Sequence, residues 1–301
     1  MARIAAIDIG TNSVLMTIAE GSADNPRVLA DRATVTRLGE GVDQSGKLTP
    51  EAILRTLDVL KKYAEEAKAV GARIFAVSTS ATRDAENSRV FLEPASAFLG
   101  SDVEIIDGKR EAELTFRGSL SGIAFPGAVT VVDIGGGSTE IVRGEAGKVI
   151  ESTSLNIGSV RLTERHLKSD PPTDQEMEAL DRNLTAVIEG SSVQPTAPLV
   201  GIAGTVTTLA AVSRKMIDYD GAEVHGTRLM TEEVREMIAG FRAVRKSDRP
   251  ARFPGLTSGR ADVIIAGAQI LLRLAERART SQITVSDRGV RWGILVEKLS
   301  G

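Results

Sequence analysis

The sequence predicts an α/β protein built from two related halves, and three observations support this fold class. Apolar segments of strand length alternate with segments of helical spacing along most of the chain, which is typical of α/β folds. A strand, glycine turn and strand near the start recur about 125 residues later, with the same Asp-Ile-Gly core at 8–10 and 133–135. The 301 residues also exceed what one simple hydrophobic core needs.

The first half opens with a predicted hairpin, a strand, a turn at residues 10–12 and a second strand within residues 3–20. A helix is expected over residues 51–70, because apolar residues recur at helical spacing behind Thr49, a good N-cap, and Pro50, which suits the first helical position. The remaining predicted elements are strands at 72–78 and 103–106 and helices at 81–99 and 110–120.

The second half repeats the opening pattern at residues 128–145 and continues with alternating elements. A glycine- and serine-containing stretch at 119–127 is the expected hinge between the halves. The elements expected after the repeat are strands at 149–154, 199–203 and 282–286, and helices at 160–168, 174–189, 231–243, 261–278 and 290–299.

Composition excludes several classes of protein. The chain is 42% hydrophobic and 26% charged, as soluble globular proteins are, and no apolar run approaches the roughly 20 residues that span a bilayer. Without a secretory signal and without cysteine, a cytoplasmic location, no membrane partner and no thiolate site are expected. A net charge of −3 and an aromatic content of 3% argue against a nucleic-acid partner.

The two Asp-Gly turns are the main candidates for chemistry. Glycine lets backbone amides approach an oxyanion, neighbouring hydroxyl groups add donors, and an aspartate at the end of the preceding strand suits a magnesium ion. A single copy is better explained as an ordinary hairpin turn. Because the Asp-Ile-Gly core occurs twice, we favour a phosphate site to which both turns contribute.

Four further segments have a functional and a structural interpretation. Gly204 and Thr205 open a helix whose N-terminus suits an anion, although such residues also serve as ordinary caps. Arg83 follows three hydroxyl residues and suits phosphate, or is a solvated side chain. Glu111 suits a general base but is equally typical of a first helical turn, and Glu140 suits water or metal positioning but is equally an outward strand residue.

Other polar and aromatic residues receive structural interpretations. Trp292 is expected to pack, and both histidines are expected at the surface or satisfied. The basic set Arg245, Lys246, Arg249 and Arg252 is expected to be a solvated loop.

Taken together, these segments resemble the exopolyphosphatase/guanosine-pentaphosphate phosphatase (Ppx/GppA) family over nearly the whole chain. The combination of DIGGGSTE with a later GSVRLTE is specific. The matching segments, in order, are residues 8–13 (DIGTNS), 37–43 (RLGEGVD), 78–87 (STSATRDAEN), 111–112, 133–140 (DIGGGSTE), 154–164 (SLNIGSVRLTE), 204–208 (GTVTT), 260–267 (RADVIIAG) and 286–295.

The resemblance implies the fold of actin-like ATPases, which sugar kinases and Hsp70 share: two ribonuclease-H-like domains around a cleft. Domain I is expected at residues 1–120 with the C-terminal helix at about 287–301, and domain II at 121–286. It also implies hydrolysis of terminal phosphoanhydride bonds of inorganic polyphosphate, a Mg²⁺ cofactor and a homodimer.

The resemblance assigns site roles residue by residue. Glu111 matches the catalytic base and Glu140 a second carboxylate, while Asp8 and Asp133 match magnesium ligands. The matching phosphate-binding residues are Gly10, Thr11, Asn12, Ser13, Arg83, Gly135, Gly136, Gly137, Ser138 and Thr139, to which the turn at Gly204 and Thr205 is added.

This chain departs from the family pattern in three places. Asp107 stands where relatives often have serine, which adds an acidic group near the base. Lys109 and Arg110 lie beside Glu111, where relatives often have acidic or polar residues. Trp292 replaces the glutamate of an Arg-Glu-Gly sequence. Longer relatives carry an additional C-terminal helical region, so processivity on long polymers is not expected here.

Three other functions stay open at this point. Hydrolysis of guanosine pentaphosphate (pppGpp) needs the same machinery and differs in the base that must be recognised. An actin-like kinase would need an acceptor pocket. A polyphosphate or alarmone sensor would bind without turnover.

Overall fold

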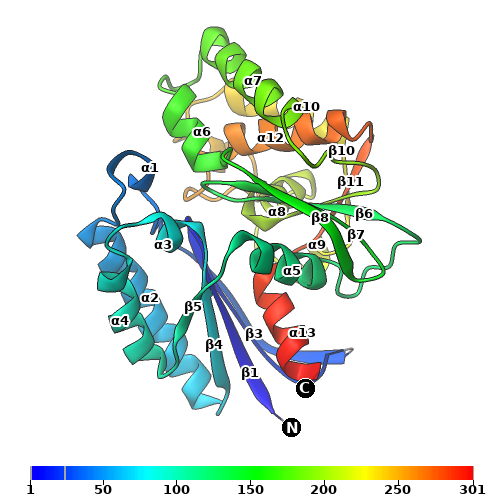
Figure 1. Ribbon diagram of the computed structural model, residues 1–301. Helices are drawn as coiled ribbons and strands as arrows, with labels where there is room; N and C mark the ends of the chain where they lie inside the picture. Colours follow the sequence, from blue (N-terminus) through cyan, green and yellow to red (C-terminus); the bar gives the residue numbers. More distant parts are fainter. Residues whose placement is uncertain (1, 24, 301) are drawn as a thin grey trace. The chain divides into compact units, whose positions relative to one another are not determined.

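The computed structural model describes residues 2–23 and 25–300 (Figure 1). The chain divides into two compact units, Met1–Ser121 with Gly289–Gly301 (unit 1) and Gly122–Arg288 (unit 2). The boundaries expected from the sequence, after residue 120 and before residue 287, lie one and two residues away from these. Among the described residues, no helix is long and apolar enough to cross a membrane.

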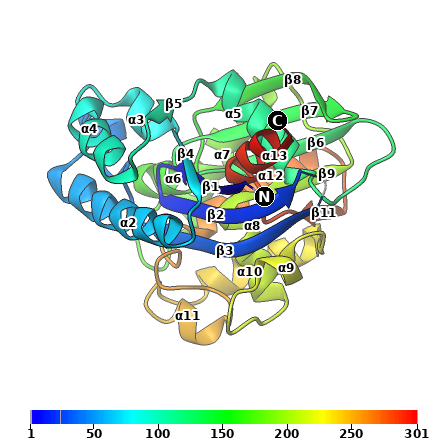
Figure 2. The ribbon, with the colours of Figure 1, turned by 90° about the horizontal axis from the view of Figure 1, so that it is seen from below.

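Unit 1 is built on a five-stranded sheet of order β3-β2-β1-β4-β5. Strand β1 pairs antiparallel with β2 and parallel with β4, and β1, β2 and β3 lie side by side in Figure 2. Its elements are β1 (Arg3–Ile9), β2 (Ser13–Ser22), β3 (Asn25–Val35), α1 (Val42–Ser45), α2 (Pro50–Ala69), β4 (Arg73–Ser78), α3 (Ser80–Asp84), α4 (Ser88–Leu99), β5 (Val103–Ile105), α5 (Gly108–Ser119) and α13 (Val290–Ser300).

The two faces of the unit 1 sheet bury different helices, because successive side chains of a strand point to opposite sides. Ala5, Ile7 and Ile9 of β1 share a core with apolar residues of α2 and α4. Ile4 and Ala6 share a second core with residues of α5 and α13. Both faces are covered, which explains why β1 is apolar almost throughout.

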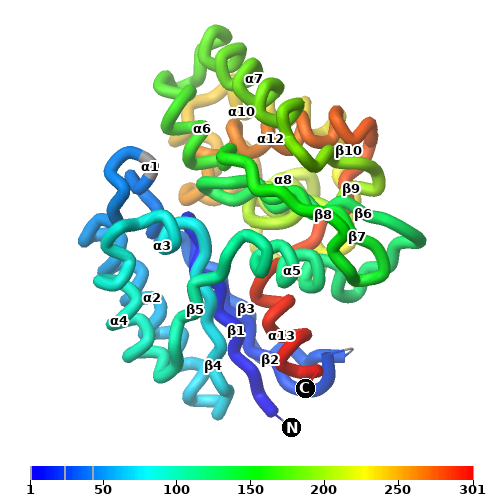
Figure 3. Tube along the Cα trace, viewed as in Figure 1, coloured from blue at the N-terminus to red at the C-terminus, as the bar shows by residue number. Residues whose placement is uncertain are grey.

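Helices α5 and α13 cross closely, although α5 belongs to the first and α13 to the last of the two chain segments that form unit 1 (Figure 3). A Cβ at Gly118 would lie 2.1 Å from the carbonyl oxygen of Gly289, and a Cβ at Gly293 would lie 2.1 Å from that of Leu114. Side chains larger than hydrogen are therefore excluded at this crossing. Arg110 of α5 also holds Glu297 of α13 through hydrogen bonds of 2.7 and 2.6 Å.

Several predicted elements of unit 1 are confirmed. The Thr49 hydroxyl accepts the amide of Ala52 at 3.2 Å, and Pro50 is the first residue of α2. The helix expected over 81–99 is interrupted, since α3 ends at Asp84 and α4 begins at Ser88. Trp292 of α13 is 4% exposed and packs in the core that α5 and α13 share with the sheet, as expected.

Unit 2 is built on a six-stranded sheet of order β10-β11-β9-β6-β7-β8. Strand β6 pairs antiparallel with β7 and parallel with β9, and β9 is parallel to β11. Its elements are β6 (Val129–Ile134), β7 (Thr139–Glu145), β8 (Lys148–Leu155), α6 (Ser159–His166), α7 (Asp174–Glu189), β9 (Leu199–Ile202), α8 (Ala203–Ser213), α9 (Gly221–Val224), β10 (Arg228–Met230), α10 (Thr231–Arg242), α11 (Arg249–Arg252), α12 (Ile264–Arg277) and β11 (Gln282–Val285).

The two sheets repeat one topology. The order β3-β2-β1-β4-β5 of unit 1 recurs in unit 2 as β8-β7-β6-β9-β11, with the same parallel and antiparallel pairings, and β10 is added at one edge. In both units the Asp-Ile-Gly core lies at the turn of the antiparallel hairpin that supplies the first two strands. The predicted α/β fold with two ribonuclease-H-like halves is confirmed.

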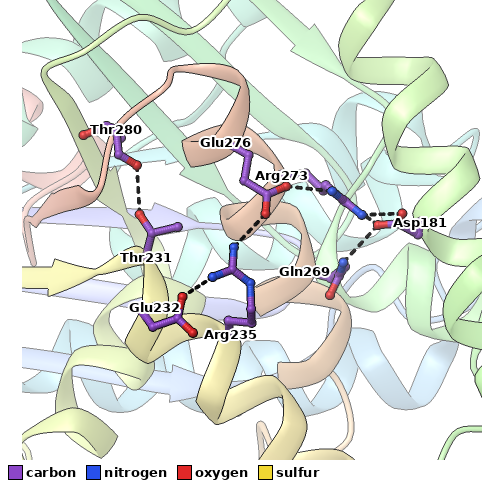
Figure 4. A network of polar contacts seen from close by, with 8 residues as sticks. All are labelled: Asp181, Thr231, Glu232, Arg235, Gln269, Arg273, Glu276 and Thr280. Atoms are coloured by element: carbon purple, nitrogen blue, oxygen red, sulfur yellow. Dashed lines mark hydrogen bonds and ion pairs between the residues drawn. The ribbon is translucent and has the colours of Figure 1, made fainter.

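Polar contacts join three helices of unit 2 around a common core (Figure 4). Asp181 of α7 accepts hydrogen bonds from Gln269, at 3.0 Å, and from Arg273, both on α12. Glu276 of α12 bridges Arg273 and Arg235 of α10, at 2.6 and 3.0 Å. Such partly exposed ion pairs contribute little free energy singly, so the apolar core beneath them carries most of the stability.

One sequence interpretation of unit 2 is wrong. Arg249 was expected in a solvated loop, but its side chain is 2% exposed and donates to the carbonyl oxygens of Phe241, at 3.0 Å, and Ala261, at 2.5 Å. Burial lowers its pKa from the ordinary value, with Asp170 and Asp262 opposing the shift. The buried Arg249 side chain thus joins α10 to the segment before α12 through hydrogen bonds.

Candidate active site

The two Asp-Ile-Gly turns have the same backbone geometry. The amide of Gly10 donates to the carbonyl oxygen of Ser13 at 3.0 Å, and the amide of Gly135 donates to that of Ser138 at 3.0 Å. In each case the hydrogen bond closes the turn between the two strands of a hairpin. The repeat read from the sequence is therefore a structural repeat of one glycine turn in each unit.

The turn of unit 1 is held from behind by the chain that follows β3. The carbonyl oxygen of Asn12 accepts the amides of Thr36 and Arg37, at 3.0 and 2.9 Å, and that of Thr11 accepts the amide of Gly39 at 2.9 Å. The Thr11 and Ser80 hydroxyls are hydrogen-bonded at 2.8 Å. These contacts bring the hydroxyl-rich segment before Arg83 next to the turn.

Asp8 ends β1 directly before this turn and carries a buried, unsatisfied oxygen. Its Oδ1 atom is buried without a hydrogen-bond partner among the described residues. Burial raises the pKa of Asp8 to about 6, while the positive charge of Arg291 acts in the opposite direction. An orphaned carboxylate oxygen in such surroundings suits a cation as its missing partner.

The structure brings Arg83 and Glu111 together. Arg83 Nη1 lies 3.3 Å from Glu111 Oε2 and donates to the carbonyl oxygen of Ile106 at 3.1 Å. The Glu111 residue is 8% exposed. A guanidinium that contacts a carboxylate in this way fixes the orientation of that carboxylate.

Asp107 has a local structural role. Its side chain caps α5 by accepting the amide of Arg110 at 2.8 Å. Serine, which the family resemblance leads us to expect at this position, has the same capping ability. The departure from the family pattern at Asp107 therefore preserves the start of the helix that carries Glu111.

The turn of unit 2 is joined to the start of α6. The amides of Ser159, Val160 and Arg161 donate to carbonyl oxygens of Gly135 and Gly136 at 2.9 to 3.1 Å. A Cβ at Gly158 would lie 2.3 Å from the Gly136 oxygen, so the approach requires glycine there. The first amides of α6 thus bind the turn itself.

Asp133 and Glu140 are paired opposite each other across the β6–β7 hairpin. Directly opposed residues of an antiparallel pair lie on the same face, and like charges in that arrangement are destabilising. Glu140 is 5% exposed, which overturns an outward strand position, and its Oε1 accepts the Ser154 hydroxyl at 2.8 Å. Two carboxylates on one buried face again suit a cation.

Gly204 and Thr205 begin α8 next to Arg260. A Cβ at Gly204 would lie 1.8 Å from a terminal nitrogen of the Arg260 guanidinium, so a larger residue would require this side chain to move. Thr205 is 2% exposed and packs against Gly267 of α12. The structure therefore places the Arg260 cation at the helix start and directs Thr205 inward.

The carboxylates present fit magnesium better than a metal held by protein alone. The described residues contain no group of three or more His, Cys, Asp and Glu side chains arranged to hold a metal ion. Mg²⁺ usually takes one or two carboxylates, several waters and substrate phosphates. Asp8 in unit 1, and Asp133 with Glu140 in unit 2, match that kind of incomplete ligand set.

Sequence reasoning missed a buried polar group on the α13 side of unit 1. Arg291 donates to the Thr17 hydroxyl at 2.8 Å and to Asp31 Oδ2 at 3.2 Å. Thr17 faces Ala6 across the β1–β2 pair and so shares a sheet face with Asp8. Polar residues in otherwise apolar strands were the available signal for this group.

Comparison with known proteins identifies the family of this chain. The Ppx/GppA phosphatase family matches residues 15–301. The chain is 42% identical to exopolyphosphatase 2 of Mycobacterium tuberculosis over 98% of both chains. It is 30% identical to a guanosine-5'-triphosphate,3'-diphosphate pyrophosphatase of Photobacterium profundum over 98% of this chain, and it spans 59% of the length of that protein.

Solved structures give the same relationship. A Ppx/GppA family member of Aquifex aeolicus superposes with a TM-score of 0.85 at 37% identity, covering 99% of this chain and 97% of the other. An exopolyphosphatase of Cytophaga hutchinsonii gives 0.89 at 29% identity, with 99% and 98% covered. From its repeated glycine turns, its paired arginine and glutamate and its full-length similarity, this chain belongs to the Ppx/GppA phosphatase family.

Proposed function

We propose that this protein is an exopolyphosphatase that hydrolyses the terminal phosphoanhydride bond of inorganic polyphosphate. The contact of Arg83 with the buried carboxylate of Glu111, on a unit that also carries a glycine turn, is the observation that carries the proposal. The name of the relative at 42% identity supports the same substrate.

Glu111 is proposed as the general base. Its carboxylate accepts a proton from a water molecule, the water oxygen bonds to the terminal phosphorus, and the bridging P–O bond breaks to release orthophosphate and a shortened chain. Arg83 contacts both the carboxylate and a backbone carbonyl, so it is suited to orient Glu111 and to neutralise phosphate charge.

The two glycine turns are proposed to bind phosphate oxygens through backbone amides and hydroxyl groups. The residues with this role are Gly10, Thr11, Asn12 and Ser13 in unit 1, and Gly135, Gly136, Gly137, Ser138 and Thr139 in unit 2. Thr139 also anchors the second turn, since its hydroxyl donates to the Ile157 carbonyl at 2.6 Å.

Mg²⁺ is proposed as cofactor, with Asp8 in unit 1 and Asp133 with Glu140 in unit 2 as its candidate ligands. When bound, it neutralises phosphate charge as the bridging bond breaks. The unsatisfied oxygen of Asp8 and the opposed carboxylates of unit 2 support this assignment.

Phosphate release tests the function directly. Release from tripolyphosphate, long polyphosphate and guanosine pentaphosphate is measured with magnesium, for the wild type and Glu111→Gln. Fast release from polyphosphate that falls roughly 10²–10⁴-fold in the variant, with binding retained, is expected for loss of a general base. Wild-type turnover in Glu111→Gln would refute the base assignment, and binding without any release would favour a sensor.

Hydrolysis of guanosine pentaphosphate is the second candidate, and Tyr219 is the observation that favours it. Tyr219 is 51% exposed, and its hydroxyl donates to Asp287. Asp287 follows β11, which is parallel to β9, so it lies at the same end of the sheet as Gly204, which follows β9. An exposed ring beside a carboxylate suits a purine base.

A further inference from the structure

Helix α6 extends from the unit 2 glycine turn and carries basic side chains beyond it. The segment from Arg161 to Lys168 contains three Arg or Lys residues and one acidic residue, Glu164, in a chain whose net charge is −3. Arg165 and Lys168 are exposed. This local charge is therefore opposite in sign to the charge of the whole protein.

The first of these cations is anchored on the turn. Arg161 Nε donates to the carbonyl oxygen of Gly137 at 2.6 Å. The first amides of α6 already donate to the carbonyl oxygens of Gly135 and Gly136. The N-terminal end of this helix therefore offers side chains, and not these backbone amides, to further anions. The Arg161 guanidinium thus marks the place where a polyanion leaving the turn would meet the helix.

Arg165 lies on the same helix, and Lys168 lies two residues beyond its end. Arg165 is four residues after Arg161, so both emerge on one face about 6 Å apart along the helix axis, and helical side chains lean toward the N-terminus, here toward the turn. Lys168 folds back onto the last turn of α6, where its ammonium donates to the Glu164 carbonyl oxygen. The three cations form a row that starts at the turn.

A neighbouring histidine lies close enough to respond to these charges. Burial lowers the pKa of His166 most, the positive charges of Arg165 and Lys168 lower it further, and the Asn183 side chain opposes the shift. Leu162 of the same helix is fully buried in the unit 2 core. Helix α6 is therefore anchored on the core while it carries exposed charge.

We propose that Arg161, Arg165 and Lys168 form a subsite for the internal phosphate groups of linear polyphosphate, beyond the terminal phosphate at the glycine turn. This proposal rests on the proposed function for its ligand. A short chain would reach Arg161, whereas only a longer chain would also reach Arg165 and Lys168. The row would thus favour long chains over tripolyphosphate.

The test measures binding separately from turnover. End-labelled long polyphosphate and tripolyphosphate are titrated against protein carrying Glu111→Gln, with Arg165→Gln/Lys168→Gln added. Loss of two exposed ion pairs should weaken long-chain binding about three- to tenfold and reduce the ratio of long- to short-chain affinity. The dependence of log affinity on log salt should become shallower by about 1–2.

Lys148→Gln/Arg277→Gln is the matched control. Both side chains are exposed. Lys148 begins β8 and Arg277 ends α12 before β11, so both lie at the end of the strands away from the turn. The control should keep the wild-type affinity ratio. Glu164→Gln, which removes the acidic group beside the row, should strengthen long-chain binding.

An unchanged affinity ratio in the Arg165/Lys168 variant, or an equal decrease in the control, would overturn the proposal. Failure of the proposed function is a different result: wild-type protein that releases no phosphate from any substrate. Loss of long-chain binding in the row variant alone would then still support the subsite.

Discussion

Asp8 shows how one buried side chain couples the site to stability. Its folded-state pKa of about 6 is above the ordinary value of 3.8, so the folded protein binds more protons than the unfolded chain between these pH values. The stabilising contribution is complete below about pH 4 and is lost as pH rises through 6. Without metal, the ionised carboxylate is thus a cost to folding at neutral pH.

Asp8→Asn should remove this cost in a chelating buffer. We expect the free energy of unfolding of the variant at pH 8 to exceed that of the wild type by about 1–3 kcal/mol, and the difference to shrink toward pH 4. Urea unfolding at several pH values measures it, with Asp58→Asn on the exposed side of α2 as control. An equal pH profile for wild type and Asp8→Asn would contradict the burial argument, and an unchanged magnesium titration of activity would exclude Asp8 as a ligand.

At the scale of elements, two close backbone contacts position the candidate residues. Gly158 lets α6 approach the unit 2 turn, and the crossing at Gly118 and Gly293 joins α5, which carries Glu111, to α13. Both contacts depend on the absence of a side chain.

Gly158→Ala should impair the turn, because its Cβ would lie 2.3 Å from the Gly136 carbonyl oxygen. A displaced turn misplaces the amides that we propose to bind phosphate, so kcat/KM for polyphosphate should fall roughly 10²-fold. Gly147→Ala, where a Cβ meets nothing within 4 Å but the backbone is left-handed, controls for a general loss of stability. Activity equal to wild type would show that the α6 contact does not position the turn.

Gly293→Ala should separate α5 from α13, because its Cβ would lie 2.1 Å from the Leu114 carbonyl oxygen. Overpacking of this kind typically destabilises by about 1–3 kcal/mol. Thermal and urea unfolding measure the change. Gly108→Ala in α5, the other helix of the crossing, where a Cβ meets nothing within 4 Å, is the control and should remain close to wild type; equal stability of the two variants would refute the close crossing.

For the whole molecule, the choice between polyphosphate and guanosine pentaphosphate is the main functional question. Tyr219 and Phe98 are the most exposed aromatic side chains among the described residues, and Trp292 is buried. If the base binds at Tyr219, loss of one ring–base stack in Tyr219→Ala should lower kcat/KM for the nucleotide about 5- to 100-fold and leave polyphosphate hydrolysis near wild type. Parallel kinetics on both substrates measure it, and equal effects on both would exclude a base-specific role.

The oligomeric state and the cellular location stay predictions. The homodimer is tested by light scattering coupled to size-exclusion chromatography, where a mass near 31.9 kDa would contradict it. A cytoplasmic location is tested by cell fractionation. Neither follows from the fold of a single chain.

The sequence by itself determined the α/β class, the repeated Asp-Ile-Gly turns and the family, because glycine turns, caps and alternating apolar segments are local signals. Thr49 and Pro50 predicted the start of α2, and the Asp-Ile-Gly repeat predicted two copies of one hairpin. Strands β3 and β10 were not predicted, since exposed edge strands show little apolar alternation.

Only the tertiary structure decided which distant groups meet. The contact between Arg83 and Glu111, the opposed Asp133 and Glu140, and the burial of Arg249 depend on strand register and helix packing, which no local pattern encodes. A charged residue in a basic stretch looks solvated until the packing of α10 and α12 is known. Contacts between residues that are far apart in the sequence form only when strands and helices pack, and these contacts bring residues of separate motifs together.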